Sequence, residues 1–362
     1  MDQIPHVKFF ITGRPEPRIR SGFRLEALRP ITEVFKLHEV ERPLVDIDIK
    51  LFLRTRLTEI AKNRSHCNVS KDWPLTSDID ILCEKAAGLF IYASTAVKFV
   101  ASQHHQPPKR LTLLVSLPHS TTCEGESGTD SLYLEILRQA YKDMGSDSQK
   151  PANQEVYHRF RSVVGAVLLA FNPLSMESLA YLLHGFDSPF DISTTLSPLH
   201  SLLLVPEGTE DSIQVFHKSF PDFLLDPSRC QDTRFFVDPA IHHTEILLSC
   251  LRLMEGRLKR NICGLDDYPD LTSGNDPSAL RKEHIGDALE YACQFWTKHL
   301  VQSPSSGPDV GKVQQAIEKF FTKHLLFWIE VLVIMENLDI CVHSIDDIQQ
   351  WYILVSARYT VC

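Results

Sequence analysis

The clearest fold signal in this 362-residue sequence is the stretch Leu202-Leu203-Leu204-Val205-Pro206-Glu207-Gly208-Thr209-Glu210-Asp211-Ser212-Ile213-Gln214-Val215-Phe216. Its two ends are short apolar runs, and the middle is a polar loop. This pattern predicts a two-stranded hairpin with a loop longer than the tight minimum. Three helical segments precede it, namely Val156–Phe171, one that follows the N-cap residue Ser175, and Asp191 to about His200. Three helices followed by a hairpin predict a winged-helix domain.

Helical patterns continue on both sides of this domain. Val45–Asn63 is a predicted amphipathic helix with Asp46 as its N-cap, and its apolar stripe consists of Ile49, Phe52, Leu53, Leu57 and Ile60. A second helical region, Ser77–Ser102, contains the small-residue junction Ala86-Ala87-Gly88. Further helices are predicted after Pro239, at Ile241–Leu258, Ile285–Leu300, Val310–Asn337 and Ile345–Ala357. The predicted fold class is therefore mainly α.

A different pattern occupies the first residues. Val7–Thr12 is a short apolar run, which predicts a buried strand of an α/β core, and the turn Gly13-Arg14-Pro15 ends it. The run is too apolar for a strand edge that faces water. Exposed apolar surface, poor solubility or dependence on a partner is therefore expected at this segment.

Composition indicates an ordinary globular chain, with 43% apolar residues, 23% charged residues and a formal net charge of −9. The nine cysteines are dispersed without a C-x-x-C pair, which favours reduced thiols and a cytoplasmic or nuclear location. No signal peptide is expected at Met1, and the apolar runs are shorter than the ~20 residues that a membrane span needs. We expect a cytoplasmic protein.

The sequence offers little evidence of catalytic chemistry. The string nearest to a phosphate-binding Walker loop, Gly307–Val313, is one residue short, ends in valine and contains a proline, so we reject it. The sixteen histidines are scattered, no H-E-x-x-H occurs, and no metal site is expected. The pairs His104-His105 and His242-His243 are interpreted as structural. A catalytic triad is supported by no G-x-S-x-G elbow or cysteine-protease signature.

The winged-helix pattern raises the question of nucleic-acid binding. Residues 151–235 carry a net charge of −5, and the third helix has no Lys or Arg over Ile192–Ser201. DNA-binding relatives need basic residues to neutralise phosphates, so this surface favours protein contacts. His217 follows the hairpin, and its residue type alone favours a histidine satisfied by nearby backbone. The alternative is a hydrogen-bond donor that faces an anionic ligand.

Several motifs together resemble one family. Ile11-Thr12-Gly13-Arg14-Pro15-Glu16 resembles the sensor-1 strand end of STAND-class signal-transduction ATPases, in particular fungal NACHT proteins. Ala87–Ala93 resembles their helical-lid motif, and Phe216–Leu224 resembles their winged-helix signature. Three later segments resemble blocks that recur after the winged-helix domain in the fungal group: Leu258–Leu265, Ala288–Trp296 and Leu325–Val331. The likeness extends to about residue 335.

The resemblance implies roles for four residues. Arg14 would sense the terminal phosphate of ATP, and His217 would touch the β-phosphate of ADP in a closed state. Gly88 and Leu89 would lie beside the adenine. Exchange of ADP for ATP would swing the winged helix away and permit oligomerisation. The Walker loop and the metal-holding acid of the family are absent from this sequence, so it is expected neither to hydrolyse nor tightly to bind ATP or ADP on its own.

The resemblance also implies a domain order. Residues 1–43 would be a C-terminal remnant of the NTPase α/β core, 44–106 a helical lid, 107–153 a linker with one helix (Leu132–Met144), 154–235 a winged-helix domain and 236–362 a helical domain. The expected function is a non-catalytic regulatory portion of a nucleotide-dependent switch. It would contact protein partners or copies of itself, and neither nucleic acid nor a membrane.

Two alternatives stay open at this point. One is a winged-helix DNA-binding protein. The other is a complete ATP-binding STAND NTPase whose core is supplied in trans or lost to a truncated gene model.

Overall fold

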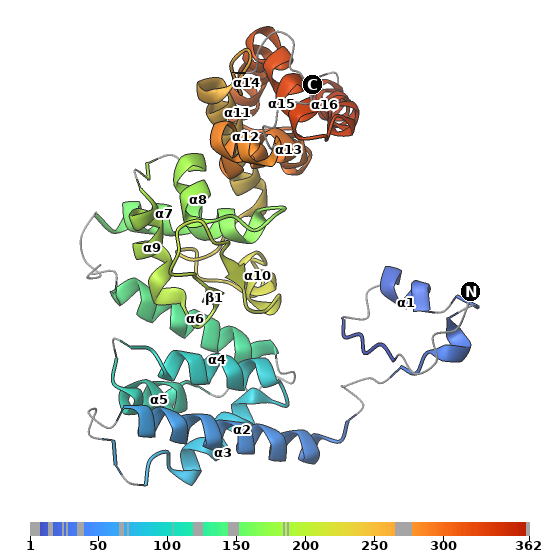
Figure 1. The fold of residues 1–362 in the computed structure, drawn as a ribbon. Helices are drawn as coiled ribbons and strands as arrows, with labels where there is room; N and C mark the ends of the chain where they lie inside the picture. The colour runs from blue at the N-terminus through green and yellow to red at the C-terminus, as the bar shows by residue number, and fades with distance from the viewer. Residues whose placement is uncertain are drawn as a thin grey trace. The chain divides into compact units, whose positions relative to one another are not determined.

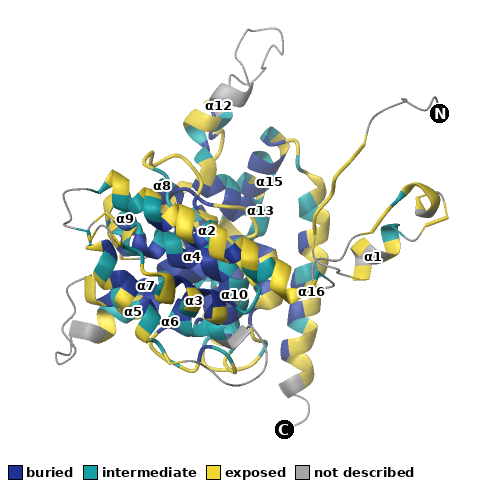
Figure 2. Cartoon of the chain, turned by 90° about the horizontal axis from the view of Figure 1, so that it is seen from below, coloured by how far each residue is buried: buried dark blue, intermediate teal, exposed yellow. Residues whose placement is uncertain are grey.

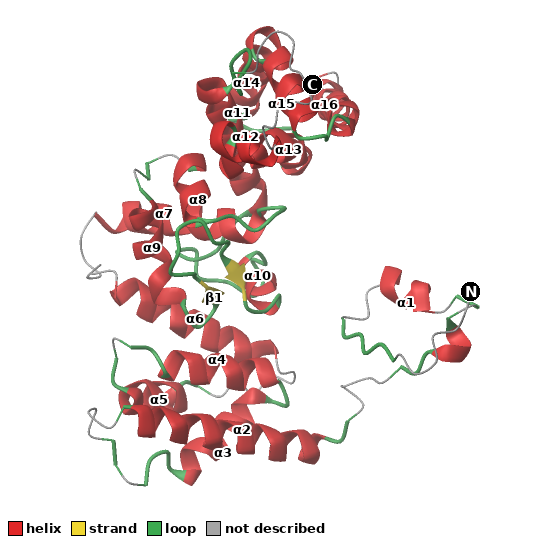
Figure 3. Ribbon diagram, viewed as in Figure 1, coloured by secondary structure: helices red, strands yellow, loops and turns green. Residues whose placement is uncertain are grey.

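The computed structural model describes residues 8–359 apart from 14–16, 24, 27, 35–39, 65–68, 71, 104, 119–125, 144–151, 184, 187 and 265–276. The chain divides into two units, Met1–Asp48 and Ile49–Cys362 (Figure 1). The described residues form helices and a small two-stranded sheet, which is a mainly α fold and confirms the predicted class (Figure 3). Among the described residues, no helix has both the length and the apolar character that crossing a bilayer requires.

The first unit contains α1 (Pro17–Phe23), the short 3-10 helix η1 (Arg29–Ile31) and the start of α2 (Arg42–Asn63). The prediction of a strand at Val7–Thr12 is wrong for its described part, because residues 8–13 have no regular secondary structure. Phe9, Phe10 and Ile11 are 85%, 93% and 66% exposed. A strand needs a neighbour for its backbone groups, and no strand lies among the described residues of this unit. In Figure 2 the described residues of this unit before Ile49 are exposed or intermediate.

Helix α2 has the predicted apolar stripe, of which Ile49, Leu53 and Leu57 are fully buried. Its start differs from the prediction, because Asp46 lies inside the helix and pairs with Arg42 at 2.7 Å instead of capping it. Pro43 stands in the first turn, where a missing backbone N–H costs nothing. The helix therefore begins before the apolar stripe does.

The next helical region is two helices, α3 (Thr76–Ala86) and α4 (Phe90–Val100). The predicted small-residue junction is where they separate: Ala87 and Gly88 have left-handed φ values of 49° and 81°. Such values end a helix, and glycine adopts them without a Cβ penalty.

The segment predicted as a linker with one helix contains two, α5 (Pro107–Ser116) and α6 (Glu126–Asp143). The prediction missed α5 because it interpreted Pro107 and Pro108 as breaks. The two prolines occupy the first turn of the helix, where proline is tolerated. Lys85 of α3 stabilises the other end of α5 by donating to the carbonyls of Leu114, Val115 and Leu117 at 2.7–2.8 Å. Carbonyls in the last turn of a helix lack the usual i+4 donor, and at this end the Leu114 carbonyl also accepts from the Leu117 N–H at 3.4 Å.

The predicted sequence of three helices and a hairpin is present. Helices α7 (Ala152–Leu169), α8 (Met176–Leu182) and α9 (Pro189–Leu196) are followed by the 3-10 helix η4 (Ser197–Leu199). Strand β1 (Leu203–Leu204) pairs antiparallel with β2 (Gln214–Val215), with Leu203 opposite Val215. Helix α10 (Ser219–Leu224) comes next. Ser175 caps α8 as predicted, because its side chain accepts from the Ser178 backbone N–H at 3.1 Å.

The remaining elements are helices α11 (Pro239–Arg257), α12 (Pro277–His284), α13 (Gly286–Gln302), α14 (Val310–Lys323), α15 (Leu325–Ile334) and α16 (Asp339–Tyr359). The single helix expected at Val310–Asn337 is broken at His324, whose φ of −123° is not helical. Helix α13 packs against α11, α15 and α16. Trp296 of α13 and Trp328 of α15 are buried between these helices. The Trp328 indole donates to the Cys293 carbonyl at 2.9 Å.

Candidate functional site

The four residues with predicted roles lie in different parts of the chain. Arg14 lies outside the described residues. Gly88 and Leu89 form the junction between α3 and α4, and Leu89 is 36% exposed. His217 lies between β2 and α10 and is exposed. Helix α4 reaches the hairpin with its other end, at Lys98, which is about 13 Å along the helix from Leu89.

His217 is held by the first residue of α10. Its Nδ1 atom lies 2.7 Å from Ser219 Oγ, and the Ser219 backbone N–H donates to the same Nδ1 at 3.1 Å. The Ser219 hydroxyl also lies 2.6 Å from the hydroxyl of Tyr133 on α6. A histidine satisfied by nearby backbone, as its residue type favoured, is thus present, and it has a further connection to another helix.

Helix α6 is the element that connects α3 and α4 to the hairpin region. It contacts α3 and α4 on one side and η4 on the other (Figure 1). Asp130 accepts two hydrogen bonds from Arg229, at 3.0 and 2.6 Å. Tyr133 packs edge-on against Phe220, at 5.5 Å between ring centroids, and its hydroxyl is the one that meets Ser219. The sequence predicted this helix but carried no signal that it bridges two regions.

A cation–π contact joins α4 directly to the hairpin. Lys98 Nζ lies 2.9 Å from the centroid of the Phe216 ring, next to His217. Burial lowers the pKa of Lys98 from its usual value. Such contacts contribute about 0.5–2 kcal/mol, depending on desolvation. Helix α4 therefore meets the hairpin at the residue that precedes His217.

The helical region has a buried cluster of neutral polar groups. His243 Nδ1 and His299 Nδ1 lie 2.8 Å apart, and Tyr291 Oη lies 2.8 Å from His299 Nε2. Burial lowers the pKa of His299 to about 3 and also lowers that of His243. Both rings are therefore neutral at pH 7. His242 and His243 were interpreted as structural, and the burial of both is consistent with that interpretation.

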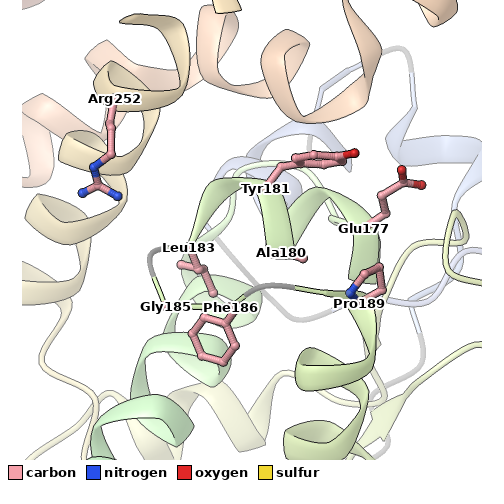
Figure 4. Close-up of a pocket in the computed structure, with 8 residues that line it drawn as sticks. All are labelled: Glu177, Ala180, Tyr181, Leu183, Gly185, Phe186, Pro189 and Arg252. Carbon is pink, nitrogen blue, oxygen red and sulfur yellow. The ribbon is translucent and has the colours of Figure 1, made fainter. Parts of the chain in front are cut away.

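A cavity of about 530 Å³ lies beside α8. Figure 4 shows Tyr181 and Glu177 on α8, Phe186 and Gly185 in the loop that follows, and Arg252 on α11. Gly88, Leu89 and His217 are not among the residues that line it. In the described part of the chain, no group of three or more His, Cys, Asp or Glu side chains is arranged to hold a metal ion.

Comparison with known proteins finds a distant relative. The chain is 24% identical over 367 residues to "Vegetative incompatibility protein HET-E-1" of the fungus Podospora anserina. The alignment takes in 95% of this chain and 24% of that protein, so the chain spans about a quarter of the relative's length. No family model and no solved structure matches. This identity shows a distant relationship.

Proposed function

We propose that this chain is a non-catalytic regulatory portion of a NACHT/STAND-type signalling switch and that it acts through protein–protein contacts. The observation that carries the proposal is the distant relationship to a fungal vegetative incompatibility protein, which extends over 95% of this chain. The NACHT-like motifs noted in the sequence occur along this chain in the order that the family resemblance implies. Signalling through partner proteins or through self-association fits both findings.

The arrangement of helices supports a switch with two parts. One part consists of α3, α4 and α5, and the other of α7 to α10 with the hairpin. Helix α6 and the Lys98–Phe216 contact join them. Tyr133 of α6 packs on Phe220 and Phe223, whereas the Lys98–Phe216 and Asp130–Arg229 contacts are charged, so a charged ligand or partner can weaken these two. Helix α9 carries no Lys or Arg, which favours a protein rather than a nucleic acid as the partner.

ATP or ADP is the ligand that the family resemblance implies, and the described residues do not fit it as a complete site. Gly88 and Leu89 lie at one end of α4, whereas the hairpin with His217 is met at the other. Within the described residues, no glycine-rich loop supplies backbone amides for phosphates. The proposal therefore assigns this chain no ATP hydrolysis on its own.

The absence of catalysis is tested with radiolabelled ATP and magnesium. We expect phosphate release no higher than that of a heat-denatured sample of the same chain. Release above that control, scaling with protein concentration and surviving a second purification step, would show that the chain is an ATPase.

The switch itself is tested at the Lys98–Phe216 contact. Lys98→Glu replaces the cation above the ring with an anion, which the ring face repels. We expect α4 to separate from the hairpin, with a larger hydrodynamic radius or self-association in analytical ultracentrifugation. Lys109→Glu is the matched control, because Lys109 is an exposed lysine on α5. Identical sedimentation of the two variants and the unmodified chain contradicts a switch at this contact.

A further inference from the structure

We infer that Tyr133 and Ser219 are positioning residues that hold His217 in the tautomer with the proton on Nε2, so that its ring acts as a hydrogen-bond donor. The inference rests on the proposed function, because it assumes that the switch has a ligand or partner and that His217, as the family resemblance implies, faces it. It adds two residues to that site and states the chemistry that the ring offers.

The first step is the backbone contact. The Ser219 backbone N–H donates to His217 Nδ1 at 3.1 Å. A backbone N–H is only a donor, so Nδ1 must supply a lone pair and carries no proton. A neutral imidazole has one proton, and it therefore resides on Nε2.

The second step gives the direction of the hydroxyl chain. Ser219 Oγ lies 2.7 Å from Nδ1, and since Nδ1 is an acceptor, the serine hydroxyl must donate to it. That donation uses the only hydrogen on Ser219 Oγ. The Tyr133 hydroxyl, 2.6 Å away, must then donate to Ser219 Oγ. The proton order runs from Tyr133 through Ser219 to His217.

The third step is the rigidity of Tyr133. Its side chain is 1% exposed, and its ring packs against Phe220 and Phe223. Asp130, one turn earlier on α6, holds Arg229 through two hydrogen bonds. Burial is the largest of the causes that raise the pKa of Tyr133, so the hydroxyl keeps its proton. The donor at the start of the chain is thus fixed in place on α6.

The consequence concerns what His217 recognises. A ring fixed as the Nε2–H tautomer presents a donor, which suits an oxygen of a phosphate, a carboxylate or a carbonyl group. It suits a cation or a hydrogen-bond donor poorly. Because Tyr133 lies on α6, the hydroxyl chain that supports this tautomer depends on the docking of α6 against α10, whereas the Ser219 backbone N–H acts within the same segment.

The test is the tautomer of His217 in the full chain labelled with 15N-histidine. Long-range proton–nitrogen spectra distinguish a protonated from an unprotonated ring nitrogen, and His217→Gln identifies the resonances. We expect an unprotonated Nδ1 and a protonated Nε2 in the unmodified chain at pH 7.5. A protonated Nδ1 overturns the inference.

Variants separate positioning from general packing. Ser219→Ala removes the donating hydroxyl, and Tyr133→Phe removes the hydroxyl that orders it. We expect mixed tautomers in Ser219→Ala and a smaller shift in Tyr133→Phe. Tyr141→Phe is the control, because Tyr141 is also buried on α6 but is not in the hydroxyl chain. Equal spectra in all three variants would show that the hydroxyls do not set the tautomer. This result is independent of ATP turnover and of sedimentation, so it fails separately from the proposed function.

Discussion

The region that joins α4, α6 and the hairpin differs from the region built around α13 in the kind of contact that holds it. The first combines the aromatic packing of Tyr133 on Phe220 with charged and polar contacts, namely Lys98 on Phe216, Asp130 with Arg229, and Tyr133 with Ser219. The second depends on packed aromatic rings, with Trp296 against both Phe320 and Trp328. Partly exposed ion pairs contribute little and are screened by salt, whereas packed aromatic cores are costly to open. The first region therefore contains the charged contacts that salt or a charged partner can weaken.

The largest effect on the free energy of unfolding is expected from a substitution in the aromatic region. Trp296→Ala removes a 1% exposed ring that packs on Phe320 and Trp328, and we expect the free energy of unfolding to fall by about 3–5 kcal/mol. Urea unfolding at pH 7.5 measures it. Val333→Ala is the control, because Val333 is 54% exposed, and a loss within about 0.5 kcal/mol is expected. Similar losses in both variants would contradict the central place given to the α13 core.

The next largest effect is expected from Lys85, the buried cation of α3 that binds the end of α5. Lys85→Met removes the three hydrogen bonds to the end of α5 and leaves those carbonyls without their donor, at a cost of about 2–3 kcal/mol. Hydrogen exchange of the α5 amides should speed up more than that of α13. Lys109→Met, a substitution on α5 itself, serves for comparison, since Lys109 is exposed. Unchanged α5 protection in Lys85→Met rules out this capping role.

The smallest expected effect is the dependence of stability on pH that arises from buried His299. His299 has a pKa of about 3 in the folded chain, below the usual value of about 6.5 in the unfolded chain. The unfolded chain therefore binds the proton first, and stability is full above pH 6.5 and falls as pH decreases from there toward 3. The slope approaches about 1.4 kcal/mol per pH unit.

Urea midpoints at pH 7, 6 and 5 measure this slope, and His299→Gln should flatten it. A slope that is the same in His299→Gln would assign the pH dependence to other groups. His243 contributes with the same sign, because burial lowers its pKa as well.

The sequence predicted much of the helical framework and little of the site. The apolar stripe of α2, the cap at Ser175 and the hairpin pairing all follow local patterns, and the structure has them. The single helix over 310–337 was wrong because no glycine or proline marks the break at His324. Arg14 lies outside the described residues, and the roles of Gly88, Leu89 and His217 stay predictions.

The sequence by itself determined where helices and the small hairpin form, since periodicity, caps and turn residues act within a few positions of one another. Tertiary structure decided the contacts between distant residues. Tyr133 and Ser219 are 86 positions apart, and no local pattern relates them. It also decided that residues 8–13 carry no strand, because a strand depends on a partner that periodicity cannot supply.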